Sequence, residues 1–230
     1  MSSPRNVVLD HRVRAAQMSQ GISSDPIYAM IHRVIEAKGL RGNILDYGAG
    51  VGHLTERLLS LQKFASVTAA DIMPVPTALA GRVAWIEQDL NLPLSTIDGA
   101  FDVVVAAEVI EHLENPRFMI REIYRLLRPQ GIAIITTPNN ESWRSILALV
   151  ARGHFVAFGD TCYPAHITAL LRQDLSRMLH EAGFSPAEFC YTDHGSVPLI
   201  PAITWQQVSL KILRGLRFSD NLLAVAQKSA

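Results

Sequence analysis

Cysteine, an excess of either charge, and long apolar runs are all scarce in this 230-residue sequence. It contains only two cysteines, Cys162 and Cys190, and they are not spaced like metal ligands. We therefore expect two ordinary thiols of a cytoplasmic protein rather than a disulfide framework. Lysine and arginine balance aspartate and glutamate, so the formal net charge is zero. This balance disfavours nucleic-acid binding of the general electrostatic type, which needs a basic field.

Membrane-spanning and secretory segments are also missing from the pattern. No apolar run approaches the ~20 residues that cross a bilayer, and the first residues are too polar for a signal peptide. We expect a cytoplasmic protein that touches a membrane at most peripherally. Apolar residues are nevertheless abundant at 49% of the chain. That is enough to build the core of one domain spanning residues 1–230.

Short β-type runs alternate with helical patterns along the chain. The runs are rich in valine and isoleucine and cover 43–47, 66–71, 82–88, 101–107 and 131–137, with later ones near 187–193 and 221–228. The helical patterns cover 53–62, 116–128 and 171–184. Apolar strands without polar alternation indicate a sheet covered on both faces. We predict an α/β, doubly wound, mainly parallel seven-stranded sheet that ends in an antiparallel strand.

Three segments lie outside this alternation. Residues 1–40 have helical patterns and are expected to cap the ligand side. Residues 139–165 form a lid-like insertion, and residues 196–219 form a second one with an apolar stripe of Trp205, Val208, Ile212 and Leu216. Such a stripe is more often core or homodimer contact than membrane contact. Because both insertions also carry arginine, they suggest an acceptor with a lipid part or anionic groups.

The glycine-rich turn ILDYGAGVG (44–52) distinguishes two kinds of ligand. Its glycines, Gly48, Gly50 and Gly52, follow the spacing G-x-G-x-G, and His53 occupies the third glycine position of a dinucleotide fingerprint. No Walker-type Gly-Lys-Ser/Thr follows. Asp46 precedes the turn, where a carboxylate would repel phosphate but attract a sulfonium or ammonium. The pattern therefore predicts a cationic or zwitterionic ligand and argues against an NAD-linked oxidoreductase.

The order of these motifs resembles that of the class I S-adenosylmethionine-dependent methyltransferases, across most of the chain. Their pattern is D-x-G-x-G-x-G, then a second strand ending in an acid, then a third acid, matched here by Asp71 and Asp89. The resemblance implies a Rossmann-like fold with S-adenosylmethionine as cofactor. The implied cofactor residues are Asp46, Gly48, Ala49, Gly50, Gly52, Asp71, Ile72, Asp89, Leu90 and Ala107. Among them, Asp71 would accept the ribose hydroxyls, and Asp89 with Leu90 would hold the adenine edge.

The string AAEVIEHLENP (106–116) is the candidate for acceptor chemistry. In a helical turn, Glu108, Glu111 and His112 can share one side. The E-x-x-E-H string resembles ubiquinone-pathway O-methyltransferases and many sugar or lipid methyltransferases. It is also similar to small-RNA terminal 2′-O-methyltransferases, in which two Glu and two His hold Mg²⁺; His166 would be the second histidine. We therefore propose His112 and His166 as catalytic residues, and Glu108, Glu111, His112 and His166 as a metal site.

Several alternatives stay open at this point. His112 can be a structural histidine, Glu111 can be solvated, and Glu108 can orient backbone. Methyl transfer from a sulfonium is an in-line displacement, and only a hydroxyl acceptor needs a base or a metal. We predict transfer to a hydroxyl oxygen of a small molecule. The alternatives are an N- or C-methyltransferase and a non-catalytic cofactor-binding subunit.

Overall fold

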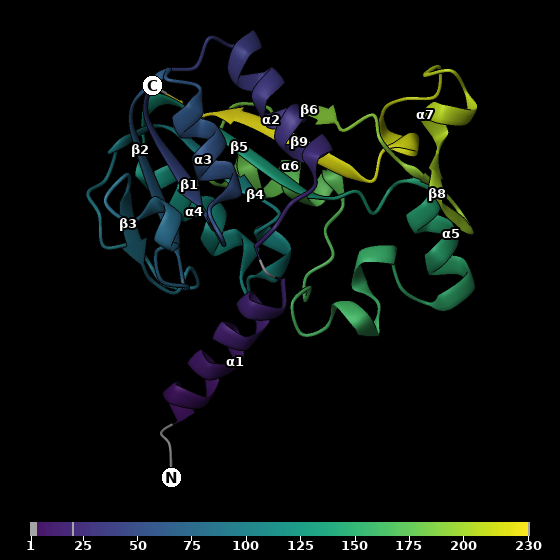
Figure 1. Ribbon diagram of the computed structural model, residues 1–230, viewed down its shortest axis with the longest axis horizontal. Coiled ribbons are helices and arrows are strands. Elements are labelled where there is room, and N and C mark those ends of the chain that lie inside the picture. Colours follow the sequence, from purple (N-terminus) through teal and green to yellow (C-terminus); the bar gives the residue numbers. More distant parts are fainter. Residues whose placement is uncertain (1–3, 20, 230) are drawn as a thin grey trace.

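The structure, a computed structural model, describes residues 4–19 and 21–229 (Figure 1). Its centre is a seven-stranded sheet with the order β3-β2-β1-β4-β5-β9-β6. The strands are β1 (Gly42–Tyr47), β2 (Phe64–Asp71), β3 (Ala84–Glu87), β4 (Phe101–Ala107), β5 (Leu127–Pro138), β6 (Glu188–Tyr191) and β9 (Asn221–Gln227). The first five run parallel, and β9 pairs antiparallel with both β5 and β6. The predicted fold class is confirmed.

Helices cover both faces of the sheet. They are α2 (Asp25–Ala37), α3 (His53–Ser60), α4 (Pro116–Leu126) and α6 (Arg172–Glu181). In β4, Val103 and Val105 pack with α2 and α3, whereas Val104 and Ala106 pack with α4 and α6. This division follows from the two-residue period of a strand, which sends alternate side chains to opposite faces.

One predicted helix ends earlier in the structure than its pattern suggests. The helix predicted over 116–128 ends at Leu126, and β5 begins at once at Leu127. Pro129 cannot continue the helical hydrogen-bonding pattern, so the chain turns into the strand before it. Between β2 and β3 the chain forms only the single turn η1 (Thr77–Leu79) rather than a helix.

The two insertions form a lobe beside β5 and β9 (right side of Figure 1). The lobe contains α5 (Trp143–Arg152), η3 (Val156–Phe158), η4 (Asp160–Cys162), the hairpin of β7 (Ser196–Val197) and β8 (Ile200–Thr204), α7 (Trp205–Val208) and η5 (Leu216–Phe218). The apolar stripe expected from Trp205 to Leu216 is corrected, because α7 ends after one turn. Trp205 packs edge-on against Phe218 at 5.6 Å between ring centroids, whereas Ile212 is 78% exposed.

The N-terminal segment divides into two helices with different roles. Helix α1 (Pro4–Ser19) extends away from the body in Figure 1, and its inner residues line a cavity. Helix α2 belongs to the core, since Ile27, Met30 and Ile31 are buried against the sheet. Within the described residues, no helix is long and apolar enough to cross a bilayer.

Candidate active site

A cavity of about 780 Å³ opens at the carboxyl ends of the parallel strands. This edge is where ligands bind in open α/β sheets. The walls come from α1, the segment after it, the ends of β1, β2 and β4, and residues 163–167. Predicted site residues in its lining are Gly48, Asp71, Ile72, Asp89, Leu90, Ala107, Glu108, His112 and His166. The fold therefore brings residues predicted from separate motifs to one cavity.

The glycine turn is held by hydrogen bonds that its backbone N–H groups donate, and it packs closely against neighbouring backbone. Gly48 N donates to Ala70 O at 2.8 Å, and Gly50 N donates to Asp71 Oδ2 at 2.7 Å. Gly50 has φ +54°, and a Cβ there would lie 2.5 Å from the Cα of Gly21. Glycine is required because the conformation is left-handed and the neighbouring backbone is in contact. The turn thereby ties β1, β2 and the segment after α1 together.

Asp46 does not face the cavity, which corrects the expected role of its carboxylate. Its side chain is 1% exposed, and its Oδ2 accepts a hydrogen bond from Thr55 Oγ1 at 2.6 Å. Burial raises the pKa of Asp46 to about 7. Ala49, Gly50 and Gly52 also lie outside the cavity lining, where they shape the turn. Asp46 therefore supports the turn and α3 from inside the protein.

Asp71 is the acid that the turn presents to the cavity. Its Oδ2 accepts from Gly50 N, and its Oδ1 accepts from Met73 N at 2.9 Å. Burial raises the pKa of Asp71, and the backbone hydrogen bonds to its carboxylate oppose that shift. Each oxygen keeps one further lone pair, so the carboxylate can accept the two hydroxyls of a diol. The predicted ribose contact fits this geometry.

Asp89 and Leu90 lie at another wall of the cavity, beside α1. Asp89 Oδ1 accepts from both the backbone N and the side-chain Nδ2 of Asn91, each at 3.0 Å. Its Oδ2 accepts from Arg12, which also contacts Glu114. The sequence analysis did not identify Arg12 or Glu114 because nothing in the pattern of α1 points to a partner 77 residues away.

Glu108 follows β4 in a left-handed backbone conformation, with φ +56°. Its Oε1 accepts from Thr136 Oγ1 and its Oε2 from Asn221 Nδ2, both at 2.8 Å. Burial raises the pKa of Glu108, and the hydrogen bonds from Thr136 and Asn221 oppose that shift. Strained backbone at a non-glycine residue is concentrated in functional sites. Both carboxylate oxygens of Glu108 are already held by the protein, and it stands apart from the cluster that the other predicted metal ligands form.

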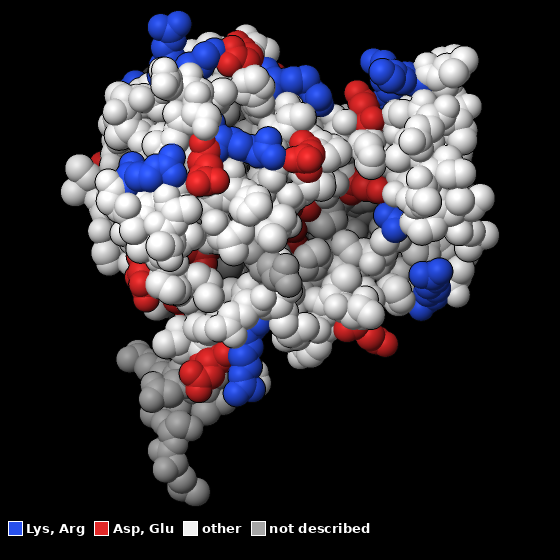
Figure 2. Space-filling model, viewed as in Figure 1, with Lys and Arg blue, Asp and Glu red and all other residues white. Residues whose placement is uncertain are grey.

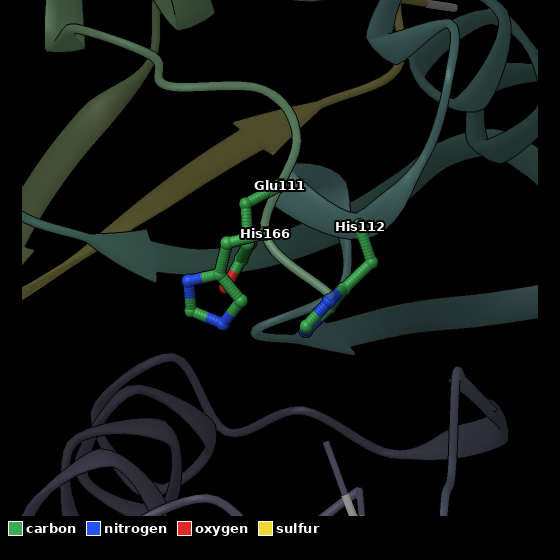
Figure 3. A group of neighbouring side chains, drawn as sticks. All are labelled: Glu111, His112 and His166. Carbon is green, nitrogen blue, oxygen red and sulfur yellow. The ribbon is translucent and has the colours of Figure 1, made fainter. Parts of the chain in front are cut away.

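Glu111, His112 and His166 converge on one point, as Figure 3 shows. One ligand atom from each lies within 4.8 Å of the others. Among the residues that the structure describes, Glu111 Oε1 and His166 Nδ1 are both buried without a hydrogen-bond partner, although Glu111 Oε2 accepts from Thr137 Oγ1 at 3.1 Å. Burial and the nearby Glu108 raise the pKa of Glu111 well above its usual range. Two buried polar atoms that lack a protein partner lie together here, and a water molecule or a metal ion could satisfy both.

His112 has its protonation pattern set by the backbone. Its Nδ1 lies 2.8 Å from Ala165 O, and a carbonyl oxygen can only accept, so Nδ1 carries the hydrogen. Nε2 is then the unprotonated nitrogen of the neutral ring. Burial lowers the pKa of His112 to about 4, so the ring is neutral near pH 7. His166 packs edge-on against it at 4.7 Å, and burial lowers its pKa as well.

The insertions contribute little to the cavity. Trp143, Phe155 and Phe158 do not line it, and the second insertion does not reach it. The contribution of the first comes from its end, where Tyr163 and Pro164 line the wall next to His166. Asn221, at the start of β9, also lines it and was not identified from the sequence. No local pattern marks Asn221, because its role depends on β9 lying next to β5.

Comparison with known proteins identifies the family of the chain. Residues 18–188 match the family described as "Methyltransferase domain". The mitochondrial ubiquinone biosynthesis O-methyltransferase of Schizosaccharomyces pombe is 31% identical over 150 residues, which are 60% of this chain and 53% of that protein. The ubiquinone biosynthesis O-methyltransferase of Pseudomonas paraeruginosa is 32% identical over 130 residues, 52% of this chain and 55% of that protein. The chain spans about half the length of these curated relatives.

A solved structure shares the whole fold. It is the 1,6-didemethyltoxoflavin-N1-methyltransferase of Burkholderia thailandensis, with bound 1,6-didemethyltoxoflavin and S-adenosylhomocysteine. The TM-score is 0.65 at 17% identity, and the match covers 100% of this chain and 92% of that one. The chain belongs to the methyltransferase family and has the Rossmann-like fold of its S-adenosylmethionine-dependent members. The predicted family and its cofactor, S-adenosylmethionine, are confirmed at this level.

Proposed function

We propose that the protein transfers the methyl group of S-adenosylmethionine to a hydroxyl oxygen of a small molecule. One observation carries the proposal: a single cavity contains Asp71 and Asp89 for the cofactor and a neutral histidine, His112, for the acceptor. Ala107, at the end of β4, also lines this cavity. In the sequence it lies between Asp89 and His112. The similarity to two ubiquinone biosynthesis O-methyltransferases supports oxygen as the acceptor atom.

His112 is proposed to accept the hydroxyl proton through Nε2. The bond from Nδ1 to Ala165 O fixes the ring and leaves the Nε2 lone pair available. Proton removal matters because a neutral hydroxyl is a weak nucleophile toward the sulfonium methyl group. His166, packed against His112, orients the ring. In-line displacement also requires the cavity to hold the acceptor oxygen in line with the methyl group.

The His112 proposal is tested with labelled S-adenosylmethionine and catechol-type or other hydroxyl acceptors, and with host extract. We expect His112→Ala to slow O-methylation about 100-fold or more while S-adenosylhomocysteine affinity stays nearly unchanged. His180→Ala, at an exposed histidine of α6, is the matched control. A normal rate of O-methylation in His112→Ala would show that His112 is not the base. Labelled product methylated on nitrogen or carbon would favour an N- or C-methyltransferase. Retention of cofactor without any labelled product would favour the non-catalytic alternative.

A metal ion is the second way in which this site can activate a hydroxyl. Glu111, His112 and His166 fit one, because their ligand atoms lie close together and, within the described part of the chain, Glu111 Oε1 and His166 Nδ1 have no hydrogen-bond partner. One carboxylate and two imidazoles suit Mn²⁺, Fe²⁺ or Zn²⁺ better than Mg²⁺, which prefers oxygen ligands. When bound, such an ion would lower the pKa of the acceptor hydroxyl. We therefore propose a three-residue transition-metal site in place of the four-residue Mg²⁺ site first expected.

The same lone pair of His112 cannot both bind a metal ion and accept a proton, so chelation separates the two mechanisms. Loss of activity in excess chelator and recovery with Mn²⁺ or Zn²⁺ supports the metal. Titration calorimetry should then show binding of the ion to wild type and not to Glu111→Gln. Full activity in chelator, with no binding of any of these ions, contradicts the metal site and leaves His112 as the base.

The lobe supports a proposed contact with anionic lipid. Its segments 142–159 and 194–219 contain no acidic residue and carry Arg144, Arg152, Lys211, Arg214 and Arg217. Leu199 and Leu210 are 92% and 87% exposed. Figure 2 shows the right-hand lobe largely white, with both blue and red side chains at its margins. Exposed aliphatic tips beside cations suit an anionic bilayer surface, where a lipid-linked acceptor would be found.

Sedimentation with vesicles tests the lipid contact. The protein should bind vesicles that contain phosphatidylglycerol and not those of phosphatidylcholine alone. Leu210→Asp combined with Lys211→Glu should abolish the binding, whereas Ile97→Asp, at a 76% exposed position outside the lobe, should not. Equal affinity of all variants contradicts the proposal. So does dimerisation through the lobe without vesicle binding.

A further inference from the structure

Arg12 reaches from α1 to two acids at the rim of the cavity. Its Nε and Nη2 donate to the two carboxylate oxygens of Glu114 at 3.0 and 2.7 Å, and its Nη1 donates to Asp89 Oδ2. The side chain of Arg12 is 23% exposed and that of Asp89 is 7% exposed. One guanidinium therefore fixes two carboxylates, using the planar fork that suits bidentate contacts.

The hydrogen bonds of Asp89 leave it a single open acceptor position. A carboxylate oxygen can accept two hydrogen bonds. Oδ1 is filled by the two donors of Asn91, and Oδ2 accepts from Arg12 and keeps one lone pair. The direction of that lone pair is set by the contact with Arg12. An amino group of a ligand in the cavity is the donor that fits this position.

Helix α1 has a matching face toward the cavity. Its lining residues, spaced three and four apart along the helix, are Val8, His11, Arg12, Ala15, Ala16 and Ser19. The segment after the helix is anchored where Gly21 contacts Gly50 of the cofactor turn. Arg12 thus connects a wall formed by α1 to the same acid that the cofactor is expected to meet.

We propose that Arg12 is a cofactor-positioning residue: it fixes Asp89 so that the remaining lone pair of Oδ2 accepts the 6-amino group of the adenine, and it holds α1 over that end of the cavity. The inference rests on the proposed placement of adenine at Asp89. Without Arg12, the carboxylate loses the contact that orients it, and α1 loses its ion pairs. The consequence is a loss of selectivity for the amino group, in addition to weaker binding.

Titration calorimetry with two ligands tests the role of Arg12. One ligand is S-adenosylhomocysteine, and the other is its analogue whose purine lacks the 6-amino group. Wild type should prefer the first by about tenfold or more, as expected for a charge-assisted hydrogen bond. Arg12→Ala should lose most of that preference, because Asp89 Oδ2 then lacks the contact that orients it. Arg117→Ala is the control, since Arg117 lies on the surface of α4 and pairs with Glu181 of α6.

The remaining variants separate the possible failures. Glu114→Gln keeps the contact between Arg12 and Asp89, so it should retain the preference even if both ligands bind more weakly. If Arg12→Ala weakens both ligands equally while Asp89→Ala removes the preference, Arg12 only anchors α1 and the inference is overturned. If Asp89→Ala leaves the preference unchanged, the adenine is not at Asp89, and the proposed placement of the cofactor fails instead. Melting temperatures without ligand identify any variant that does not fold.

Discussion

At the scale of single residues, the cofactor turn depends on glycine for two separable reasons. Gly50 combines a left-handed φ of +54° with backbone contact to Gly21, whereas Gly39 has φ +60° and open space within 4 Å of the position that a Cβ would take. Gly39→Ala should therefore lower the unfolding free energy by about 1–2 kcal/mol, which is the cost of the left-handed conformation alone. Gly50→Ala should cost more and should also weaken S-adenosylhomocysteine binding. Urea unfolding and calorimetry measure both; equal effects of the two substitutions would contradict the contact.

Asp46 gives a prediction about pH. Burial raises its pKa from 3.8 to about 7, so the folded protein retains this proton over a range in which the unfolded chain has lost it. The unfolding free energy contributed by Asp46 therefore falls as pH rises from about 4 to about 7, and stays lower above that. Asn cannot ionise. The melting temperature of Asp46→Asn, relative to wild type, should become more favourable between pH 5 and pH 8.

Differential scanning fluorimetry across this pH range provides the measurement. The other buried titratable groups, Glu108 and His112 among them, are present in both proteins and cancel in the difference. A difference between variant and wild type that is constant with pH would show that Asp46 is ionised in the folded protein throughout.

The same scale shows what the sequence could and could not predict. Gly48, Asp71 and Asp89 could be placed at one edge of the sheet, because they follow strands whose carboxyl ends must meet there. The direction in which the Asp46 side chain points could not be predicted, because an acid at a strand end can point to the ligand or into the protein. Arg12 and Asn221 escaped prediction for another reason: each contacts a site residue that is remote in sequence.

At the scale of elements, helix α4 shows how an amphipathic pattern becomes stability. Ile123 is fully buried against the sheet, and Arg121 on the same helix is exposed. Ile123→Ala removes buried methyl groups and leaves a cavity, so it should lower the unfolding free energy by about 2–5 kcal/mol. Arg121→Ala should change it by less than about 0.5 kcal/mol. Urea denaturation checks the pair, and a small effect at Ile123 would mean that α4 is not packed as described.

Elements with a strong period were predictable, and elements held by tertiary contacts were not. The apolar strands and helices α3, α4 and α6 follow from periodicity alone. The structure of the lobe does not follow from periodicity. Its apolar residues at 205–216 suggest a helix, but α7 ends at Val208. Gly215 and the left-handed Leu210 and Lys211 break the helical path there. Exposed Leu210 and Ile212 are therefore surface features of turns rather than one face of a helix.

At the scale of the whole molecule, the parallel strands bring the cofactor acids and the histidine pair to one cavity, and α1 forms one of its walls. The central claim is that this cavity binds S-adenosylmethionine through Asp71. Calorimetric titration of wild type and Asp71→Ala with S-adenosylhomocysteine tests it most directly, with NAD⁺ as the competing ligand. We predict binding of S-adenosylhomocysteine, a loss of about 1–3 kcal/mol in Asp71→Ala, and no binding of NAD⁺. Binding of NAD⁺ with no affinity for S-adenosylhomocysteine would contradict the account.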